Sequence, residues 1–264
     1  MAFFQYLLLL LSISSFTITA ESAELWTQYC NENSLINTTQ LSANIDALLP
    51  QLVSGTISNG YITTSYGKSP NQVYGLAQCR GDVSESDCAS CIQDAAKQIR
   101  ELCPKQADAR VWYDYCFLRY SPDEFAGRVD TSVGIIFYNV ENVTDPDSFN
   151  KKLGSLSDKI SKEAVSTSGN RGFIGRGKTD LSDFEKIYAL VQCTRDLSQL
   201  YCAQCLAQAI GQFPNTCNNK KGCRVLYSSC IVRYELYPFF FPLDPKETLV
   251  HVPLKNYASV IHKH

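Results

Sequence analysis

The stretch that decides the fold is CRGDVSESDCASC (79–91), in which three cysteines are separated by eight and then by two residues. The same spacing returns at CTRDLSQLYCAQC (193–205), 114 residues further along the chain. Five cysteines keep this offset: Cys79, Cys88, Cys91, Cys103 and Cys116 match Cys193, Cys202, Cys205, Cys217 and Cys230. A repeat of this length indicates two whole domains rather than a solenoid of short units.

Other residue types keep the same register. They are Tyr74 and Tyr188, Gln78 and Gln192, Asp82 and Asp196, Arg110 and Arg224, Tyr113 and Tyr227, and the pairs Arg119-Tyr120 and Arg233-Tyr234. We therefore expect one module over 24–135, a second over 136–243, and a tail over 244–264 that matches nothing in the first module. The tail is mixed in character, and the sequence leaves open whether it is a loose extension or marks relatives that continue into a membrane segment.

Each module is predicted to be an α+β domain with helices packed on an antiparallel sheet. In the first module a helix is expected over 43–53, a strand ending near Cys79, a second helix carrying Cys88 and Cys91, and an extended segment over 110–120. The corresponding early helix of the second module is expected over 147–164. The glycine-rich stretch 169–178 lacks the spacing of a phosphate-binding loop and indicates an exposed loop followed by a strand.

The N-terminal segment 1–20 contains no charged side chain and is predicted to be a secretory signal peptide cleaved after Ala20. No later segment approaches about twenty apolar residues, so no transmembrane anchor is predicted. The sequons at Asn37 and Asn142 are candidate glycosylation sites and agree with secretion. We expect an extracellular protein.

Twelve cysteines in an oxidising compartment most simply form six disulfides. Because Cys30 and Cys223 have no counterparts at the 114-residue offset, Cys103 is expected to pair with Cys30, and Cys217 with Cys223. The CxxC pairs are open to three interpretations: a zinc site, a redox motif, or structural bridges to cysteines elsewhere in the module. We favour structural bridges, Cys79 with Cys88 and Cys91 with Cys116.

Composition narrows the function. The 264 residues are 45% hydrophobic, with a net charge of −2 that disfavours nucleic acid as a partner. The three histidines all lie in the last fourteen residues, which removes His-dependent catalysis and His-rich metal sites from the modules. We expect no enzyme, no cofactor and no metal.

The doubled cysteine spacing, followed by RVLYSSCIVRYELYPFF (224–240), resembles the plant cysteine-rich repeat secretory proteins, which consist of two ginkbilobin-type (stress-antifungal) domains. The same ectodomain is similar to those of cysteine-rich receptor-like kinases and plasmodesmata-located proteins. The resemblance covers about residues 24–242. It implies two helices on an antiparallel sheet in each module, a location in the apoplast, and the bridges Cys30–Cys103, Cys79–Cys88 and Cys91–Cys116.

The family also includes an antifungal relative that binds mannose through an Asn, an Arg and a Glu. The matching positions here are Asn31, Arg110 and Ser121 in the first module, and Arg224 and Glu235 in the second, whose Asn is not identified by the sequence. The alternative for both arginines is pairing with a local carboxylate, Asp114 or Glu235. Trp112 and the aromatic residues of 234–241 are more typical of core than of sugar stacking.

Three functions remain as hypotheses. The first is a secreted, non-enzymatic protein that binds a mannose-like cell-wall or fungal carbohydrate in antifungal defence or stress. The second is a protein-interaction module, recognising a receptor ectodomain or a second copy of itself, which the apolar run YELYPFFFP (234–242) suggests if it is exposed. The third is a thiol oxidoreductase acting through CxxC.

Overall fold

Capping residues set the bounds of the helices in the first module. Helix α2 (Thr39–Asn59) begins after Thr38, whose side chain accepts a hydrogen bond from a backbone N–H of the first turn, and it ends at Gly60 with a φ of 72°. Helix α3 (Glu85–Leu102) begins after Ser84, which caps in the same way. The computed structural model describes residues 23–166, 173–242 and 246–263, so the expected signal peptide lies outside the described residues.

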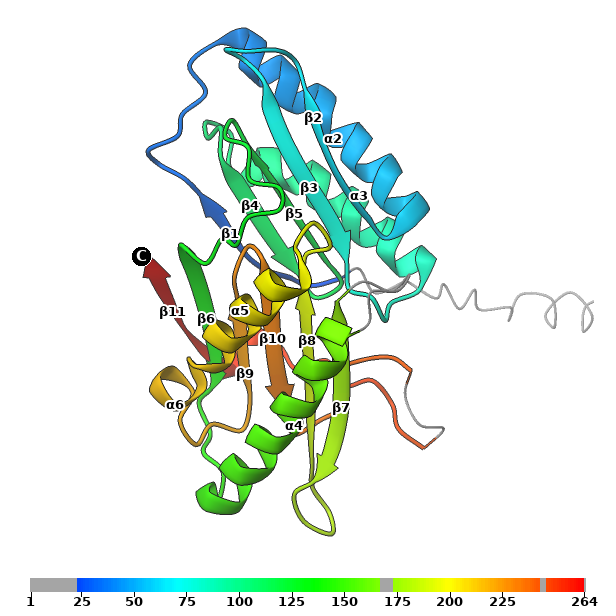
Figure 1. The fold of residues 1–264 in the computed structure, drawn as a ribbon, viewed down its shortest axis with the longest axis vertical. Coiled ribbons are helices and arrows are strands. Elements are labelled where there is room, and N and C mark those ends of the chain that lie inside the picture. Colours follow the sequence, from blue (N-terminus) through cyan, green and yellow to red (C-terminus); the bar gives the residue numbers. More distant parts are fainter. Residues whose placement is uncertain (1–22, 167–172, 243–245, 264) are drawn as a thin grey trace, which may run out of the picture.

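The first module is an antiparallel sheet with two helices on one face, as Figure 1 shows. The strands follow the order β1-β4-β5-β3-β2 across the sheet. Their bounds are β1 (Leu25–Cys30), β2 (Tyr61–Tyr66), β3 (Val73–Cys79), β4 (Ala109–Tyr113) and β5 (Cys116–Ser121). The expected single extended segment 110–120 is therefore two strands, because the chain turns at Asp114 and Tyr115.

The second module repeats this plan with one additional strand. Its sheet has the order β11-β6-β9-β10-β8-β7. The elements are β6 (Val133–Asn139), α4 (Pro146–Ser166), β7 (Ile174–Asp180), β8 (Lys186–Cys193), α5 (Gln199–Ile210), α6 (Phe213–Thr216), β9 (Cys223–Leu226), β10 (Cys230–Glu235), the 3-10 turn η1 (Leu254–Asn256) and β11 (Tyr257–Lys263). The boundary expected at 135/136 falls inside β6.

The tail is part of the second sheet. Strand β11 pairs antiparallel with the whole of β6, from Tyr257 opposite Asn139 to Lys263 opposite Val133. Of the two alternatives that the sequence left open for the tail, a loose extension does not apply to 257–263.

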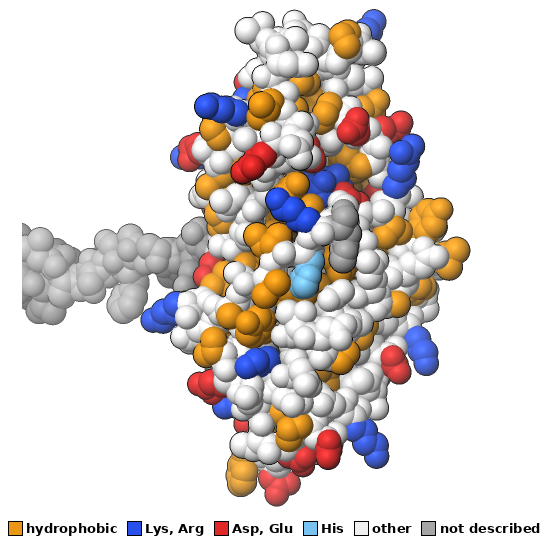
Figure 2. All heavy atoms as spheres, turned by 90° about the vertical axis from the view of Figure 1, so that its left-hand side faces the viewer, with side chains coloured by type: hydrophobic (Ala, Val, Ile, Leu, Met, Phe, Trp, Pro, Cys, Tyr) orange, Lys and Arg blue, Asp and Glu red, His pale blue; other side chains and the backbone are white. Residues whose placement is uncertain are grey.

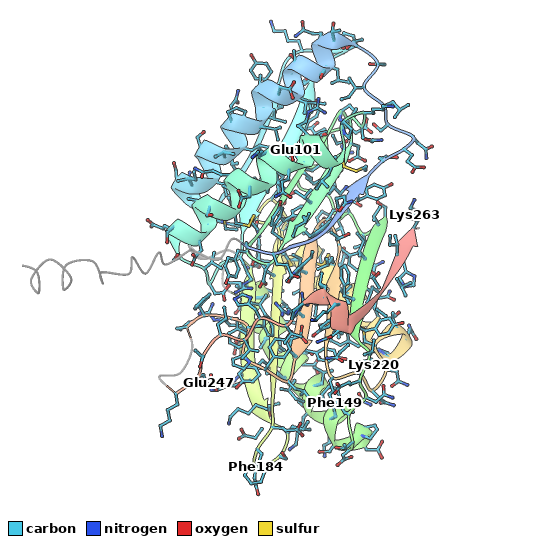
Figure 3. All side chains as sticks on the ribbon, turned by 180° about the vertical axis from the view of Figure 1, so that it is seen from behind. Glu101, Phe149, Phe184, Lys220, Glu247 and Lys263 are labelled. Carbon is cyan, nitrogen blue, oxygen red and sulfur yellow. A yellow bond between two sulfur atoms is a disulfide. The ribbon has the colours of Figure 1, made fainter. Side chains whose placement is uncertain are left out.

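The two modules share a hydrophobic cluster. Trp26, Trp112 and Phe117 from the first module pack with Phe137 and Leu226 from the second. Figures 1 and 3 show the first module's helices on one side of the molecule and α4 and α5 on the opposite side, with the sheets between them. Each module also has its own core beneath its helices.

Six disulfides staple the molecule, and every one closes within a single module. They are Cys30–Cys103, Cys79–Cys88, Cys91–Cys116, Cys193–Cys202, Cys205–Cys230 and Cys217–Cys223. These are the pairs that the sequence and the family resemblance led us to expect. No cysteine is free.

Candidate functional site

The arginines that the sequence singled out lie at the junction between the two modules. Arg110 on β4 is 5% exposed and donates a hydrogen bond from Nη1 to the Ser228 hydroxyl of the other module. Arg224 on β9 is 1% exposed, and its guanidinium lies 4.7 Å from the ring of Trp26, which belongs to the first module. Both side chains therefore contribute to the contact between the modules.

In the second module Arg224 pairs with Glu235. The Glu235 Oε1 atom accepts hydrogen bonds from Nε of Arg224 at 3.1 Å and from Nε of Arg233 at 2.9 Å, and the Glu235 side chain is fully buried. The other oxygen accepts a hydrogen bond from the Tyr257 hydroxyl of β11. Burial and the Glu235 charge both raise the pKa of Tyr257, so its hydroxyl stays protonated and keeps donating. The tail thus covers this site.

The asparagine that the sequence did not identify in the second module is Asn139. Sheet register locates it: Tyr29 lies opposite Arg110 in the first sheet, and Phe137 lies opposite Arg224 in the second. Asn31 and Asn139 each come two residues later in the chain. Both use their side-chain oxygen to accept a hydrogen bond from the backbone N–H two residues on, at 3.1 and 2.9 Å.

The second module therefore has all three residues, Asn139, Arg224 and Glu235. The 114-residue register could not reveal Asn139, because β6 lies outside that register and Asn139 follows Tyr138, whereas Asn31 directly follows a cysteine. Sheet pairing, which the sequence does not give, is the signal that finds it.

The first module replaces its missing Glu with two aspartates. Asp130 Oδ2 lies 3.1 Å from Nη1 of Arg110 and 3.0 Å from Nη1 of Arg119, so it binds this pair of arginines as Glu235 binds the other pair. Asp108 Oδ2 accepts from Nδ2 of Asn31 at 3.0 Å and lies 3.5 Å from Nη2 of Arg110. Asn31 and Arg110 are therefore joined through one carboxylate.

The space around this strand explains why one module has an aspartate where the other has a glycine. The position of Asp108 is taken by Gly222 in the second module, where a Cβ atom would lie 2.0 Å from Glu235 Oε2. Glycine is required there because the long Glu235 side chain covers it. Ser121 is too short to reach that space in the first module, which leaves room for Asp108.

The first-module cluster is partly open and has unused hydrogen-bonding atoms. The Asn31 side chain is half-buried and the Asp130 side chain is 18% exposed, whereas Glu235 is not exposed at all. Asp108 Oδ1 and Arg110 Nε are buried with no hydrogen-bond partner. Such orphaned atoms are uncommon in native proteins, so an ordered water or another small polar group is expected to complete their hydrogen bonds.

The junction is also closed by pseudo-symmetric hydrogen bonds. Gln78 Nε2 donates to the Cys193 carbonyl at 2.9 Å, and Gln192 Nε2 donates to the Cys79 carbonyl at 3.2 Å. Their side-chain oxygens accept in turn from the N–H groups of Arg195 and Gly81. The repeat register that marked these glutamines thus reflects the contact between the modules.

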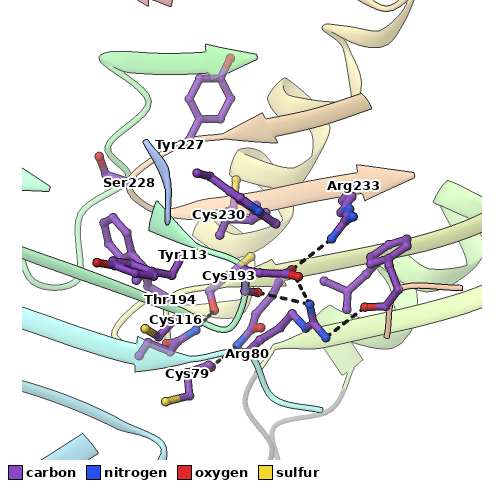
Figure 4. A pocket seen from close by; sticks show the side chains of 18 residues that line it. Cys79, Arg80, Tyr113, Cys116, Cys193, Thr194, Tyr227, Ser228, Cys230 and Arg233 are labelled. Carbon is purple, nitrogen blue, oxygen red and sulfur yellow. Dashed lines mark hydrogen bonds and ion pairs between the residues drawn. The ribbon is translucent and has the colours of Figure 1, made fainter. Parts of the chain in front are cut away.

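A carboxylate at the centre of the junction binds two arginines. Asp114 Oδ1 lies 2.8 Å from Nη1 of Arg80 and 3.1 Å from Nη1 of Arg233. Figure 4 labels the two arginines and marks their contacts with dashed lines. Burial acts to raise the pKa of Asp114, but the surrounding positive charges, chiefly those of Arg80 and Arg233, outweigh burial and lower it. The cavity beside this cluster is about 40 Å³, large enough for water but much smaller than an ordinary ligand pocket.

The aromatic run of 234–241 is mostly core. Phe239 and Phe240 are 2% and 8% exposed, and Trp112 is fully buried. This confirms the expectation that these aromatic residues belong to the core, and the exposed apolar patch that the interaction hypothesis requires is not present on this run. On the face shown in Figure 2, hydrophobic side chains lie in separate groups among charged side chains of both signs.

The cysteines and sequons complete the inventory of expected sites. Each CxxC cysteine bonds to a cysteine outside its own motif, which excludes both the redox and the zinc interpretations of these motifs. Across the described ranges no group of three or more His, Cys, Asp or Glu side chains is arranged to hold a metal ion. Asn37 and Asn142 are both exposed, so glycosylation at these positions stays a prediction.

The fold and junction define a class of protein: two duplicated, disulfide-stapled α+β modules joined into one unit. Within the described part of the chain, no helix has the length and hydropathy needed to cross a bilayer. The chain belongs to the stress-antifungal family, described as salt stress response/antifungal, whose model matches residues 29–123 and 138–237.

Individual relatives agree with this assignment. The chain is 59% identical to cysteine-rich repeat secretory protein 55 of Arabidopsis thaliana, over 84% of this chain and 85% of that protein. It is 40% identical to an antimicrobial ginkbilobin-2-like protein of Castanea crenata, over 88% of this chain and 94% of that protein. The tandem DUF26 ectodomain of the Arabidopsis receptor-like protein PDLP8 has a similar structure, with a TM-score of 0.72 and 26% identity over 81% of this chain and 98% of that chain. The protein is therefore a secreted, extracellular member of this family.

Proposed function

We propose that this protein is a non-enzymatic recognition protein that binds a mannose-like cell-wall or fungal carbohydrate during plant defence or stress. The family description and the antimicrobial name of the Castanea relative support the defence role. The observation that carries the ligand class is the partly open cluster of Asn31, Asp108, Arg110 and Asp130 in the first module.

The chemistry of this cluster suits a sugar. A sugar hydroxyl both donates and accepts hydrogen bonds, and it is best bound where charged donors and acceptors lie together. Arg110 supplies the donors, the two aspartates supply acceptors, and the Asn31 amide supplies both. Asp108 Oδ1 and Arg110 Nε have no hydrogen-bond partner among the described residues, so a sugar hydroxyl that reached either atom would supply the missing partner.

The equivalent residues of the second module, Asn139, Arg224 and Glu235, do not form the binding site in this proposal. Its Glu235 already accepts from two arginines and a tyrosine, and it has no exposed surface. Replacing Arg224 or Glu235 removes one partner of a buried ion pair and costs about 3–5 kcal/mol of stability. Loss of sugar binding in those variants would therefore report unfolding rather than recognition.

The test compares two equivalent asparagines. Asn31→Ala and Asn139→Ala both remove a side chain at a strand end with the same local hydrogen bond, but only Asn31 belongs to the open cluster. We expect Asn31→Ala to weaken mannoside binding about tenfold, or about 1.4 kcal/mol, and Asn139→Ala to leave the binding constant unchanged. Titration calorimetry on the oxidised, glycosylated protein, after a glycan array, measures both.

Two results would contradict the proposal. Equal losses in the two variants would mean that the effect comes from the strand end and not from the cluster. If the native protein bound no glycan at all, carbohydrate recognition would be wrong, and protein–protein recognition at the cell surface would remain as the alternative.

A further inference from the structure

A groove of about 460 Å³ runs between helix α4 and strand β7, on the far side of the second module from the junction. Its lining contains four lysines, three hydroxyl side chains and one leucine, and no carboxylate. These residues are Lys151, Lys152, Lys159, Lys178, Ser148, Ser155, Thr179 and Leu156. Because the whole chain has a net charge of −2, this groove is locally opposite in sign to the protein.

The lysines differ in how they are held. Lys152 Nζ donates to the backbone carbonyls of Asp180 and Leu181 at 2.9 and 3.1 Å, which fixes its position. The Asp180 carboxylate pairs with Lys186 and is also close enough to Lys152 for that lysine to help lower its pKa, so it offsets part of the Lys152 charge. The Lys159 side chain is 73% exposed and only approaches Glu163, at 4.0 Å. Lys178 pairs with Glu247 of the tail at 2.8 Å. Lys151 is exposed and forms no ion pair with any described residue.

The fold does not require these lysines. Helix α2 packs on β2 in the first module as α4 packs on β7, yet α2 contains no lysine and a single charged residue, Asp46. The charge of the groove is therefore a property of the second module alone, added to a packing arrangement that works without it.

We propose that the groove between α4 and β7 binds a linear polyanionic polysaccharide. Lys151 and Lys159 lie about 12 Å apart along the helix, at 1.5 Å per residue, so a ligand that meets both must be an extended chain with repeated negative charges. Hydroxyl side chains along the walls match the hydroxyl groups of a sugar chain. With one leucine in its lining, the groove offers little to the side chains of an acidic peptide.

An anionic membrane fits the same surface less well. The most exposed apolar side chain near the groove, Phe184 at the tip of the β7–β8 hairpin, is 97% exposed and points away from the molecule in Figure 3. It is flanked in sequence by Asp183 and Glu185, which an anionic lipid surface would repel. The lysines line a concave groove instead of this tip.

The experiment measures binding of polygalacturonate, of dextran sulfate and of vesicles containing phosphatidylserine, with neutral dextran as the uncharged control. We expect affinity for a charged polymer to fall about tenfold or more between 50 and 200 mM salt, because binding releases counterions from several charges. The double variant Lys151→Glu with Lys159→Glu should bind the charged polymer at least tenfold more weakly than the parent protein at the same salt concentration. Lys97→Glu with Lys105→Glu, two exposed lysines of the first module, makes the same change in net charge and should have little effect.

Each outcome decides the question. Selective loss in the groove variant supports the proposal, and the polymer preferred tells whether carboxylate or sulfate groups are recognised. Equal loss in both double variants, no binding to either charged polymer at 50 mM salt, or binding only to vesicles containing phosphatidylserine would overturn it. Asn31→Ala should leave polymer binding unchanged, which separates this inference from the carbohydrate site of the first module.

Discussion

At the scale of single residues, the same side chains are used differently in the two modules. Arg110 and Arg224 occupy equivalent strand positions, yet the first binds Asp108 and Asp130 and the second binds Glu235. The alternative of a local carboxylate partner is what the structure shows for Arg224. Asp114, expected as a possible partner of Arg110, instead binds Arg80 and Arg233.

The Asp114 pairs predict how stability depends on acid. Because the pKa of Asp114 is lower in the folded protein, its contribution is present above the unfolded value of about 4 and is lost as the pH falls below it. We expect the melting temperature to fall below about pH 4. Asp114→Asn should destabilise the protein at pH 7 by about 3–5 kcal/mol and flatten the pH dependence.

Thermal unfolding between pH 2 and pH 7 measures this effect. Asp123→Asn is the matched control, since Asp123 is exposed and forms no ion pair in the described part of the chain. An Asp114→Asn protein with the stability and the acid response of the parent would refute the assignment.

At the scale of elements, cysteine spacing and hydrophobic periodicity located the helices and strands, but not their ends. Helix α2 extends beyond the expected 43–53 because Thr38 and Gly60 supply its caps. The turn between β4 and β5 escaped prediction because 110–120 contains no glycine or proline, and Asp114 is a single turn-forming residue among aromatic and β-branched neighbours. Strand β11 escaped because it adds to the sheet through backbone hydrogen bonds, which no repeat in the sequence encodes.

The packing of α4 on β7 yields a prediction with two glycines. A Cβ atom on Gly175 would lie 1.9 Å from the carbonyl oxygen of Ile160 in α4, so the helix would have to move. Gly175→Ala should destabilise the protein by about 1–3 kcal/mol. Gly154 lies within α4 with nothing near its Cβ position, so Gly154→Ala should stabilise by about 0.5–1 kcal/mol.

Denaturant unfolding of the two variants gives both values. A neutral Gly175→Ala would mean that α4 lies further from β7 than the structure has it, and would also weaken the description of the groove.

At the scale of the whole molecule, the modules meet through buried polar groups as well as a hydrophobic cluster. The sequence showed that Gln78 and Gln192 occupy equivalent positions in the two modules. It did not show that their side chains form hydrogen bonds across the junction, because a contact between two copies cannot be inferred from either copy alone. The candidate sugar-binding residues were likewise identified from the residue types at matching positions of the sequence. How deeply each of them is buried could not be predicted.

We expect the protein to unfold in one calorimetric transition. Gln78→Ala and Gln192→Ala each leave a buried carbonyl and a partly buried N–H without partners, so each should cost about 1–3 kcal/mol. The two losses should be similar because the contacts are pseudo-symmetric. Two separate transitions in the parent protein, or a loss confined to one glutamine, would contradict the shared junction.

Since every disulfide closes inside its own module, the backbone between β5 and β6 is the sole covalent link from one half to the other. Asp123 and Glu124 lie exposed on that link. A protease cutting there would produce two fragments that elute together on size-exclusion chromatography. The fragments would separate in a denaturing detergent, whether or not a reductant is present. A molecule built this way tolerates nicking outside the cell without coming apart.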